Sequence, residues 1–449
     1  MNNSKSFYLS IWRWHFYAGL YVVPFMIMLS VTGLMMLYAP KLERWLHADL
    51  FYLPYDRHGS MSYEAQTRLV ADHYPDATIK YLYVTQGPHD ATRFQLSRPD
   101  EDFWVFVDPV AERILGDLSI THSLYAWADD THGTFMLGLT GDWMIEIATS
   151  LTILLIVTGV FLWWPRGNKS LFQALRIRFG GNRSMWRDIH SVSGILLSVF
   201  LLFFCISGLS WTSVWGAKLV QAWSTFPMEK SAANVSSVLT HDELNRQGLK
   251  QIPWNLEQAP MPESLVMDGS SVSLDNLVVR SRSMGFSRFQ LHFPVGDTGV
   301  YTATASSMGR DIENATDDRT IHFDRYNGAV LADIGYEDYN WFAKSMAIGI
   351  ALHMGQMGWW NLLLCTFYCV GVLGLCITGV IMWWQRRPGK LLVLGAPPMP
   401  KDLRRWQHAT WLLLPLSLLF PMAAATMITM LAIDFIASRW IPQVHTLYR

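Results

Sequence analysis

The chain has 449 residues, of which 51% are hydrophobic and 16% are charged, and its formal net charge is -1. The balanced charge points to no particular class of partner, and we expect no nucleic-acid partner. Five stretches without Asp, Glu, Lys or Arg are long enough to cross a hydrocarbon core of ~30 Å, which takes about 20 helical residues. They exclude a soluble protein and predict a mainly α-helical membrane protein; the stretches are 16–37, 147–164, 191–215, 345–385 and 409–433.

The chain divides at the ends of these stretches. The first one is longer than the apolar region of a cleaved signal peptide, and no small-x-small cleavage site follows it, so we expect a retained helix. In chain order, the predicted parts are a first transmembrane helix (1–38), a first outer domain (39–140), a second helix (141–165), a basic loop (166–188), a third helix (189–216), a second outer domain (217–345), a fourth transmembrane segment (346–385), a second basic loop (386–407) and a fifth, C-terminal helix (408–436).

The two basic loops determine the predicted orientation, because Lys and Arg in short loops stay on the cytoplasmic side of a membrane. The N-terminus is then cytoplasmic and both long domains lie outside, which in a Gram-negative cell means the periplasm. We therefore expect a multi-pass protein of the bacterial inner membrane. The basic residues are Arg166, Lys169, Arg176, Arg178, Arg183 and Arg187 in one loop, and Arg386, Arg387, Lys390, Lys401, Arg404 and Arg405 in the other.

Both outer domains have the pattern of small α+β modules, in which strand alternation follows a helix and turn residues separate the strands. Neither domain contains a cysteine, so we expect no disulfide framework. The four cysteines lie inside predicted spans, where we interpret them as packing residues. The first domain has a helix at 63–73 and strands at 78–85, 93–97, 103–107 and 114–116; the second has a helix at 274–284 and strands at 287–293, 300–306, 319–323 and 330–332.

The two halves of the chain repeat each other. His15 is followed four residues later by Gly19, and His190 is followed at the same spacing by Gly194. The repeat predicts two pseudo-symmetric units, each with two transmembrane helices flanking an outer domain, and leaves the fifth helix outside it. The other matching elements are Thr32-Gly33 with Ser207-Gly208, Thr158-Gly159 with Thr378-Gly379, Trp163-Trp164 with Trp383-Trp384, and His132 with His353.

Four histidines recur by this symmetry at the ends of spans. His15 and His190 begin helices that start in the cytoplasm, and Gly33 follows His15 by 18 residues, or ~27 Å of helix. His132 and His353 precede helices that run inward from the outer side. An ionisable group at membrane depth is a functional candidate. The sequence therefore predicts an inner pair and an outer pair of histidines.

Histidines paired at equal depth are what a bis-histidine haem needs, since one neutral imidazole approaches the iron from each face. Gly19 and Gly194 lie one turn after their histidines, where a missing side chain makes room for a porphyrin edge. Arg13 and Arg187 are candidates to hold haem propionates. The chain has no Cys-x-x-Cys-His, so we expect two non-covalent b-type haems.

The remaining histidines have weaker patterns. His408 follows two arginines on the inner side but lacks the later glycine, so we interpret it as interfacial or as a substitute ligand. His122 precedes His132 by ten residues and is an alternate ligand without a counterpart in the second half. We interpret the others as surface or hydrogen-bonded side chains: His47, His58, His73, His89, His241, His292, His322 and His445.

These motifs together resemble the PepSY-associated transmembrane proteins, which include inner-membrane reductases of ferric siderophores. The resemblance covers nearly the whole chain. The residues that carry it are Arg13-Trp14-His15 with Gly19, the run 131–138 around His132, Arg187-Asp188-Ile189-His190 with Gly194, the run 324–333, Leu352-His353-Met354-Gly355 and both Trp-Trp endings.

The resemblance implies that the outer domains are PepSY domains and that His15, His190, His132 and His353 bind haem b. It also implies single-electron reduction of Fe(III) held by a siderophore or another chelator, which releases Fe(II). The sequence has no glycine-rich dinucleotide fingerprint after a strand, so we expect a separate electron donor, either a membrane quinol or a cytoplasmic reductase.

Two other functions fit parts of the sequence. The two-fold repeat also suits a transporter of iron or siderophore, although few charges lie within the spans, Glu146 being one. A PepSY regulatory or binding protein without a redox role is the third interpretation. A reduced b-type haem spectrum separates the first function from both alternatives.

Overall fold

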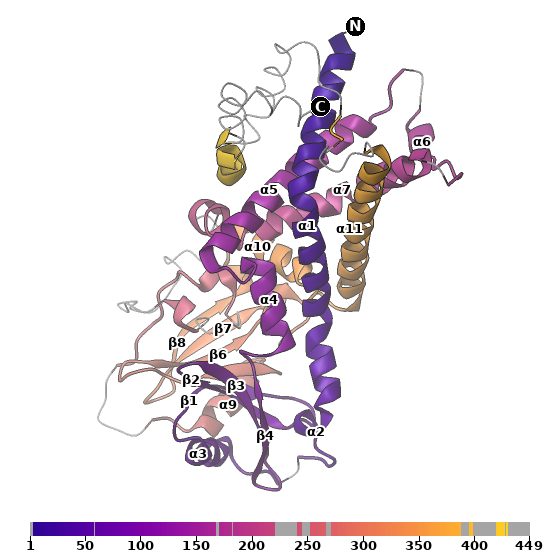
Figure 1. Cartoon of the computed structure of the whole chain (residues 1–449). Coiled ribbons are helices and arrows are strands. Elements are labelled where there is room, and N and C mark those ends of the chain that lie inside the picture. Colours follow the sequence, from indigo (N-terminus) through magenta and orange to yellow (C-terminus); the bar gives the residue numbers. More distant parts are fainter. Residues whose placement is uncertain are drawn as a thin grey trace. The chain divides into compact units, whose positions relative to one another are not determined.

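The structure is a computed structural model that describes residues 3–57, 59–167, 170–181, 183–220, 240–244, 252–265, 271–387, 395–397, 419–426 and 428–429 (Figure 1). The chain forms two compact units. We call the unit made of Met1–Leu34, Asp129–Val220 and Leu364–Arg449 the helical unit, and the unit made of Met35–Ala128 and Gln221–Leu363 the sheet unit.

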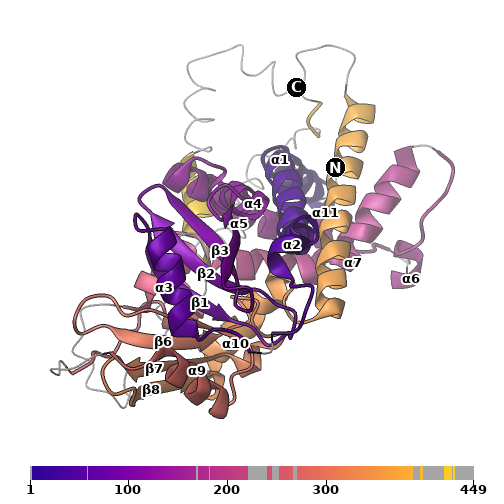
Figure 2. The same cartoon turned by 90° about the horizontal axis from the view of Figure 1, so that it is seen from below.

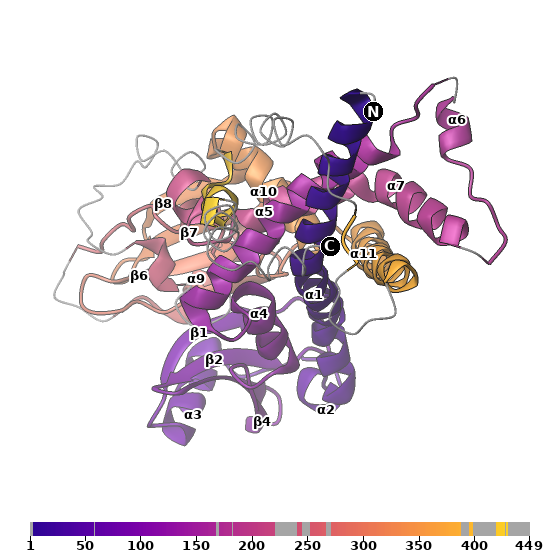
Figure 3. The ribbon, with the colours of Figure 1, turned by 45° about the horizontal axis from the view of Figure 1, so that its top comes forward.

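Among the described residues, four helices are long and apolar enough to cross a membrane, which agrees with a multi-pass protein. They are α1 (Asn3–Leu46), α5 (Gly138–Trp163), α7 (Arg183–Leu209) and α11 (Trp359–Arg386), and Figure 3 shows them from a second direction. Helix α1 continues past the predicted end of the first span, and α5 packs against α7. The predicted fifth helix (408–436) lies outside the described residues except at 419–426 and 428–429.

A short helix precedes each of two spanning helices. Helix α4 (Leu124–Thr134) ends before Phe135 and Met136, both of which have positive φ, and α5 follows. Helix α10 (Trp341–His353) ends before Gly355 and Gly358, whose φ angles are 70° and 82°. Because only glycine adopts such angles without strain, the predicted segment 346–385 is divided here into α10 and α11.

The strands of both predicted outer domains join in one antiparallel sheet of eight strands, in the order β4-β3-β2-β1-β5-β6-β7-β8 (Figure 2). Strands β1 and β5 pair at its centre, with Leu82 opposite Leu291. The two predicted modules therefore share a sheet. Its strands are β1 (Thr78–Val84), β2 (Thr92–Arg98), β3 (Glu101–Asp108), β4 (Arg113–Ser119), β5 (Phe289–His292), β6 (Val300–Ala305), β7 (Arg319–Asp324) and β8 (Val330–Gly335).

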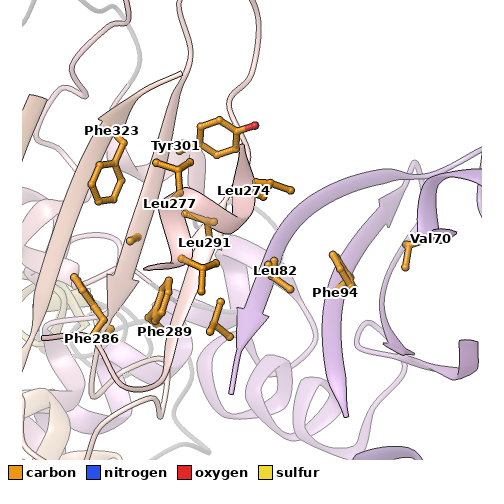
Figure 4. Packing of buried hydrophobic residues seen from close by; sticks show 14 of the residues in the cluster. Val70, Leu82, Phe94, Leu274, Leu277, Phe286, Phe289, Leu291, Tyr301 and Phe323 are labelled. Atoms are coloured by element: carbon orange, nitrogen blue, oxygen red, sulfur yellow. The ribbon is translucent and has the colours of Figure 1, made fainter. Parts of the chain in front are cut away.

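One face of the sheet carries the apolar core. Helices α3 (Tyr63–His73) and α9 (Leu274–Ser283) contact each other and cover this face. Ser62 caps α3 by accepting a hydrogen bond from the backbone N–H of Ala65. Figure 4 shows the alternate strand residues that meet the two helices, among them Leu82, Phe94, Phe289, Leu291 and Phe323.

The opposite face is also largely buried, but many of its side chains are polar. Strand pairing places these residues in two lines across the sheet, because residues two apart on a strand share a face. One line is Arg93, Tyr83, Gln290, Thr304 and Thr320, and the next is Gln95, Tyr81, His292, Thr302 and His322.

The remaining elements are short. They are α2 (Ala48–Phe51), α6 (Leu171–Ala174), the π-helical turn η1 (Trp215–Val220) and the 3-10 turns η3 (His241–Leu244), η4 (Trp254–Leu256), η5 (Ala315–Asp317) and η6 (Tyr336–Asp338).

Candidate functional site

His15 lies on α1 and contacts α5 through a threonine. The ring atom Nδ1 is 2.9 Å from Oγ1 of Thr158. The Thr158 hydroxyl is also 2.7 Å from the carbonyl oxygen of Leu154, to which it donates its proton. Gly159 follows this threonine, and a Cβ atom placed there would lie 3.3 Å from Cε1 of His15. The imidazole of His15 thus packs against the pair Thr158-Gly159 of α5.

His190 on α7 has the same arrangement against α11. Its Nδ1 is 3.0 Å from Oγ1 of Thr378, and the Thr378 hydroxyl donates to the carbonyl of Gly374 at 2.9 Å. A Cβ at Gly379 would lie 3.6 Å from Cε1 of His190. The predicted inner histidines therefore have matching partners in the two halves of the chain.

His132 on α4 meets α1 in the same way. Its Nδ1 is 2.9 Å from Oγ1 of Thr32, whose hydroxyl donates to the carbonyl of Met28 at 2.8 Å. A Cβ at Gly33 would lie 3.6 Å from Cε1 of His132 and 3.7 Å from Sγ of Cys369. Three of the four predicted histidines therefore each rest on a Thr-Gly pair of a spanning helix.

The hydroxyl contacts assign the neutral tautomer of these rings. A threonine hydroxyl has a single proton, and here it goes to the carbonyl one helical turn earlier. The hydroxyl oxygen then accepts from the histidine, so Nδ1 carries the ring proton. In the neutral ring the lone pair is then on Nε2. This arrangement, in which Nδ1–H is held and Nε2 is available, is the one found in histidines that ligate a metal.

His15 and His190 lie close enough within the helical unit for a charge on one ring to be felt by the other. Both lie towards the N-terminal end of their helices, α1 and α7. His353 is the last residue of α10, belongs to the sheet unit and is half-buried.

Among the described residues no group of three or more His, Cys, Asp or Glu side chains is placed to hold a metal ion. A bis-histidine haem, however, needs only two protein ligands.

The two arginines predicted to hold propionates already have protein partners. Arg13 is buried and donates to the Tyr17 hydroxyl at 2.9 Å and to the carbonyl of Pro397. Arg187 is exposed and pairs with Asp188 at 3.3 Å.

Arg386, the last residue of α11, has no such partner among the described residues. Its Nε and Nη2 atoms are buried without a hydrogen-bond acceptor among the described residues. The guanidinium lies 5.2 Å from the ring centroid of Trp12 and 4.7 Å from that of Phe16, both on the helix of His15. Buried N–H groups without acceptors are costly, so an acceptor from outside the described residues would be favourable here.

The other candidates of the sequence analysis are also placed. A Cβ at Gly19 would meet no atom within 4 Å, and one at Gly194 would meet only Leu375 at 3.7 Å, so there is room beside both histidines. His122 is exposed, and His408 lies outside the described residues. Glu146 accepts hydrogen bonds from the backbone N–H groups of Val214 and Trp215, so it holds the chain where η1 begins, after α7.

The match to known proteins covers most of the chain. A family model described as the PepSY-associated TM region matches residues 12–386. The chain belongs to the PepSY-associated transmembrane family. This confirms the resemblance inferred from the motifs. A search of curated proteins finds no match to this PepSY-associated chain.

Two features of this PepSY-associated protein were not predicted from the sequence. The Thr-Gly pairs were interpreted only as matching elements of the repeat, whereas in the structure they contact the histidines directly. The signal was present, since Thr158-Gly159 and Thr378-Gly379 occur at matching positions. Arg386 was also assigned only to the basic loop, and no pattern distinguishes this arginine from Arg387 beside it.

Proposed function

We propose that this protein is an inner-membrane carrier of electrons that binds two b-type haems non-covalently and reduces Fe(III) held by a siderophore or similar chelator on the periplasmic side. The N-terminus is cytoplasmic and the sheet unit is periplasmic in this proposal, which follows the charge asymmetry of the loops. Release of Fe(II) from the chelator then supplies iron for uptake.

The observation that carries the proposal is the shared state of His15, His190 and His132. Each ring donates from Nδ1 to a threonine, so in the neutral ring the Nε2 lone pair is kept for another partner. Histidines that only anchor a helix at the membrane interface need no such uniform tautomer. The repetition in both halves of the chain favours ligation of a cofactor.

The residues present fit haem. His15 and His190 would hold it on the inner side, and Arg386 offers two N–H donors to a propionate. On the outer side, the sequence repeat pairs His132 with His353. Bound haem supplies one-electron chemistry, because its iron alternates between the Fe(III) and Fe(II) states.

The reaction balances with one electron for each ferric chelate. Fe(III)-chelate takes up one electron and becomes Fe(II), which the chelator holds weakly. The electron comes from a separate donor, for which we propose a membrane quinol or a cytoplasmic reductase. One quinol oxidised to quinone would release two electrons and two protons and so reduce two ferric chelates.

The proposal is tested by reducing the purified protein anaerobically and adding ferric siderophores one at a time. Reoxidation is followed in the visible spectrum, and Fe(II) is captured by a ferrous chelator. We expect reoxidation with at least one ferric chelate and its loss in His132→Ala and His353→Ala. No reoxidation by any chelate, or full reoxidation in both variants, would contradict the reductase function.

A further inference from the structure

Arg93 lies on the polar face of the sheet and is surrounded by aromatic rings. Its Cζ atom is 4.0 Å from the ring centroid of Tyr83, 5.2 Å from that of Trp104 and 5.5 Å from that of Phe51. Rings placed over a guanidinium occupy its faces and leave its N–H groups, which lie in its plane, free to point outward.

These N–H groups have no acceptor in the protein. Among the described residues, Arg93 makes no hydrogen bond and no ion pair with a carboxylate within 4.0 Å. The side chain is half-buried, so water or a ligand reaches it. A guanidinium has five donors, and here water or a ligand that offers acceptors is left to satisfy them.

Two further arginines lie near Arg93. Arg44 contacts the same Phe51 ring at 5.7 Å, and the charges of Arg44 and Arg93 act on each other. Arg310 donates to the carbonyl of Met36 at 3.2 Å, and its charge acts on Glu43 together with those of Arg44 and Arg93. We call Arg44, Arg93 and Arg310 the arginine cluster.

The carboxylates nearby do not neutralise the cluster. Asp311 accepts from the backbone N–H of Ser306 at 3.1 Å and from Nε2 of Gln290 at 3.3 Å, which are neutral donors. Burial raises the pKa of Asp311 to about 6. Even with Asp311 and Glu43 both ionised, three positive charges face two negative ones, so the cluster keeps a positive charge.

We propose that the arginine cluster binds the carboxylate groups of an anionic ferric chelate such as a citrate-type complex. Planar carboxylates match the in-plane N–H groups of Arg93, and Arg44 is available to a second carboxylate. This inference rests on the proposed function, since it names the chemical class of the electron acceptor.

The test uses Ga(III) citrate, which has the charge and shape of the ferric complex but is not reduced. Binding to the full haem-loaded protein is measured by equilibrium dialysis at two salt concentrations. We expect Arg93→Gln to weaken binding roughly tenfold or more and to reduce its salt dependence. Arg44 is exposed and makes no hydrogen bond among the described residues. The variant Arg44→Gln should therefore weaken binding without disturbing the fold.

Arg68→Gln is the matched control, because Arg68 is an exposed arginine of the same unit that pairs with Glu64 on α3. It should bind Ga(III) citrate like the unmodified protein, and a Ga(III) chelate of positive charge should not respond to Arg93. Equal binding in all variants would overturn the proposal. Binding that appears only after haem is extracted would also overturn it, because haem propionates would then be the carboxylates that the cluster holds.

The result separates this inference from the proposed function. A protein that contains no haem when it is first purified, and that binds Ga(III) citrate through Arg93, would disprove the reductase and leave the anion site standing. A haem-loaded protein that is reoxidised by ferric chelates but does not bind Ga(III) citrate would disprove the anion site alone.

Discussion

Nδ1 of His15 lies 2.9 Å from Oγ1 of Thr158, a residue 143 positions later in the chain. His190 and Thr378 have the same relationship at 3.0 Å. In each case the threonine hydroxyl donates a hydrogen bond to a carbonyl oxygen of its own helix and accepts a hydrogen bond from the ring. The threonine therefore fixes both the orientation of the imidazole and the nitrogen that remains available.

We predict that Thr158→Val weakens haem binding at the inner site. Valine has nearly the same shape but cannot accept the Nδ1 proton, and loss of such an outer contact typically costs 10–100-fold in affinity. Haem retained per chain after purification measures the effect. Thr158→Ser keeps the hydroxyl and should retain haem, whereas equal retention in the valine and serine variants would show that the hydroxyl has no role.

The two histidine pairs should load independently. Replacing His15 or His190 by Ala should empty the inner site and leave the outer one filled, since 18 helical residues, or ~27 Å, separate His15 from Gly33, beside which His132 lies. Replacing His132 or His353 should do the reverse. Redox titration of each variant resolves the remaining haem, and identical titrations for His15→Ala and His353→Ala would refute the pairing.

Arg386→Gln should lower the midpoint potential of the inner haem. A positive charge near the iron favours its reduced state, so removing the charge favours the oxidised state. Arg386→Lys should keep most of the potential. Arg387→Gln is the control at the same helix end, because Arg387 lies over the Trp384 ring at 4.5 Å. Equal shifts in the two glutamine variants would argue against a specific contact of Arg386 with haem.

Buried histidines on the polar face of the sheet, and His241 of η3, which contacts His322 on that face, should make the stability of the sheet unit depend on pH. Burial lowers the pKa of His292 to about 3 and that of His241 to about 4. The unfolded chain takes up these protons near pH 6.5, but the folded chain does not. The free energy of unfolding therefore falls as the pH falls below 6.5, by about 1.4 kcal/mol per pH unit for each such group.

Asp311 and Asp318 oppose this trend, because burial raises their pKa values to about 6 and about 7. A comparison of His292→Phe with the unmodified protein cancels their effect. The variant should gain stability relative to the parent between pH 6.5 and 4, measured by hydrogen exchange of β5 to β7. The exposed His122→Asn should show no such gain, and a difference for His292→Phe that does not change with pH would contradict the prediction.

Local patterns predicted much of the sheet unit. The helix expected at 63–73 is α3 (Tyr63–His73), and the strand expected at 319–323 lies within β7 (Arg319–Asp324). The pairing of β1 with β5 was not predicted, because contacts between strands 200 residues apart depend on tertiary packing rather than on local alternation. For that reason two separate modules were expected where one sheet forms.

For the candidate site, the sequence predicted the histidines but not their contacts. Symmetry identified the four histidines, because repeated spacing is visible in a single sequence. The threonine contacts and the unpaired donors of Arg386 were not predicted, since they depend on which helices are neighbours. His292 was interpreted as a surface or hydrogen-bonded residue, but it is buried, and its Nε2 has no partner among the described residues.

The most direct test of the central claim is the amount of haem per chain in the purified protein. We expect two haems of b type per chain, visible in the reduced spectrum and removed by acid-acetone because they are not covalently attached. A value near zero would contradict the proposed function and favour a transporter or a regulatory protein.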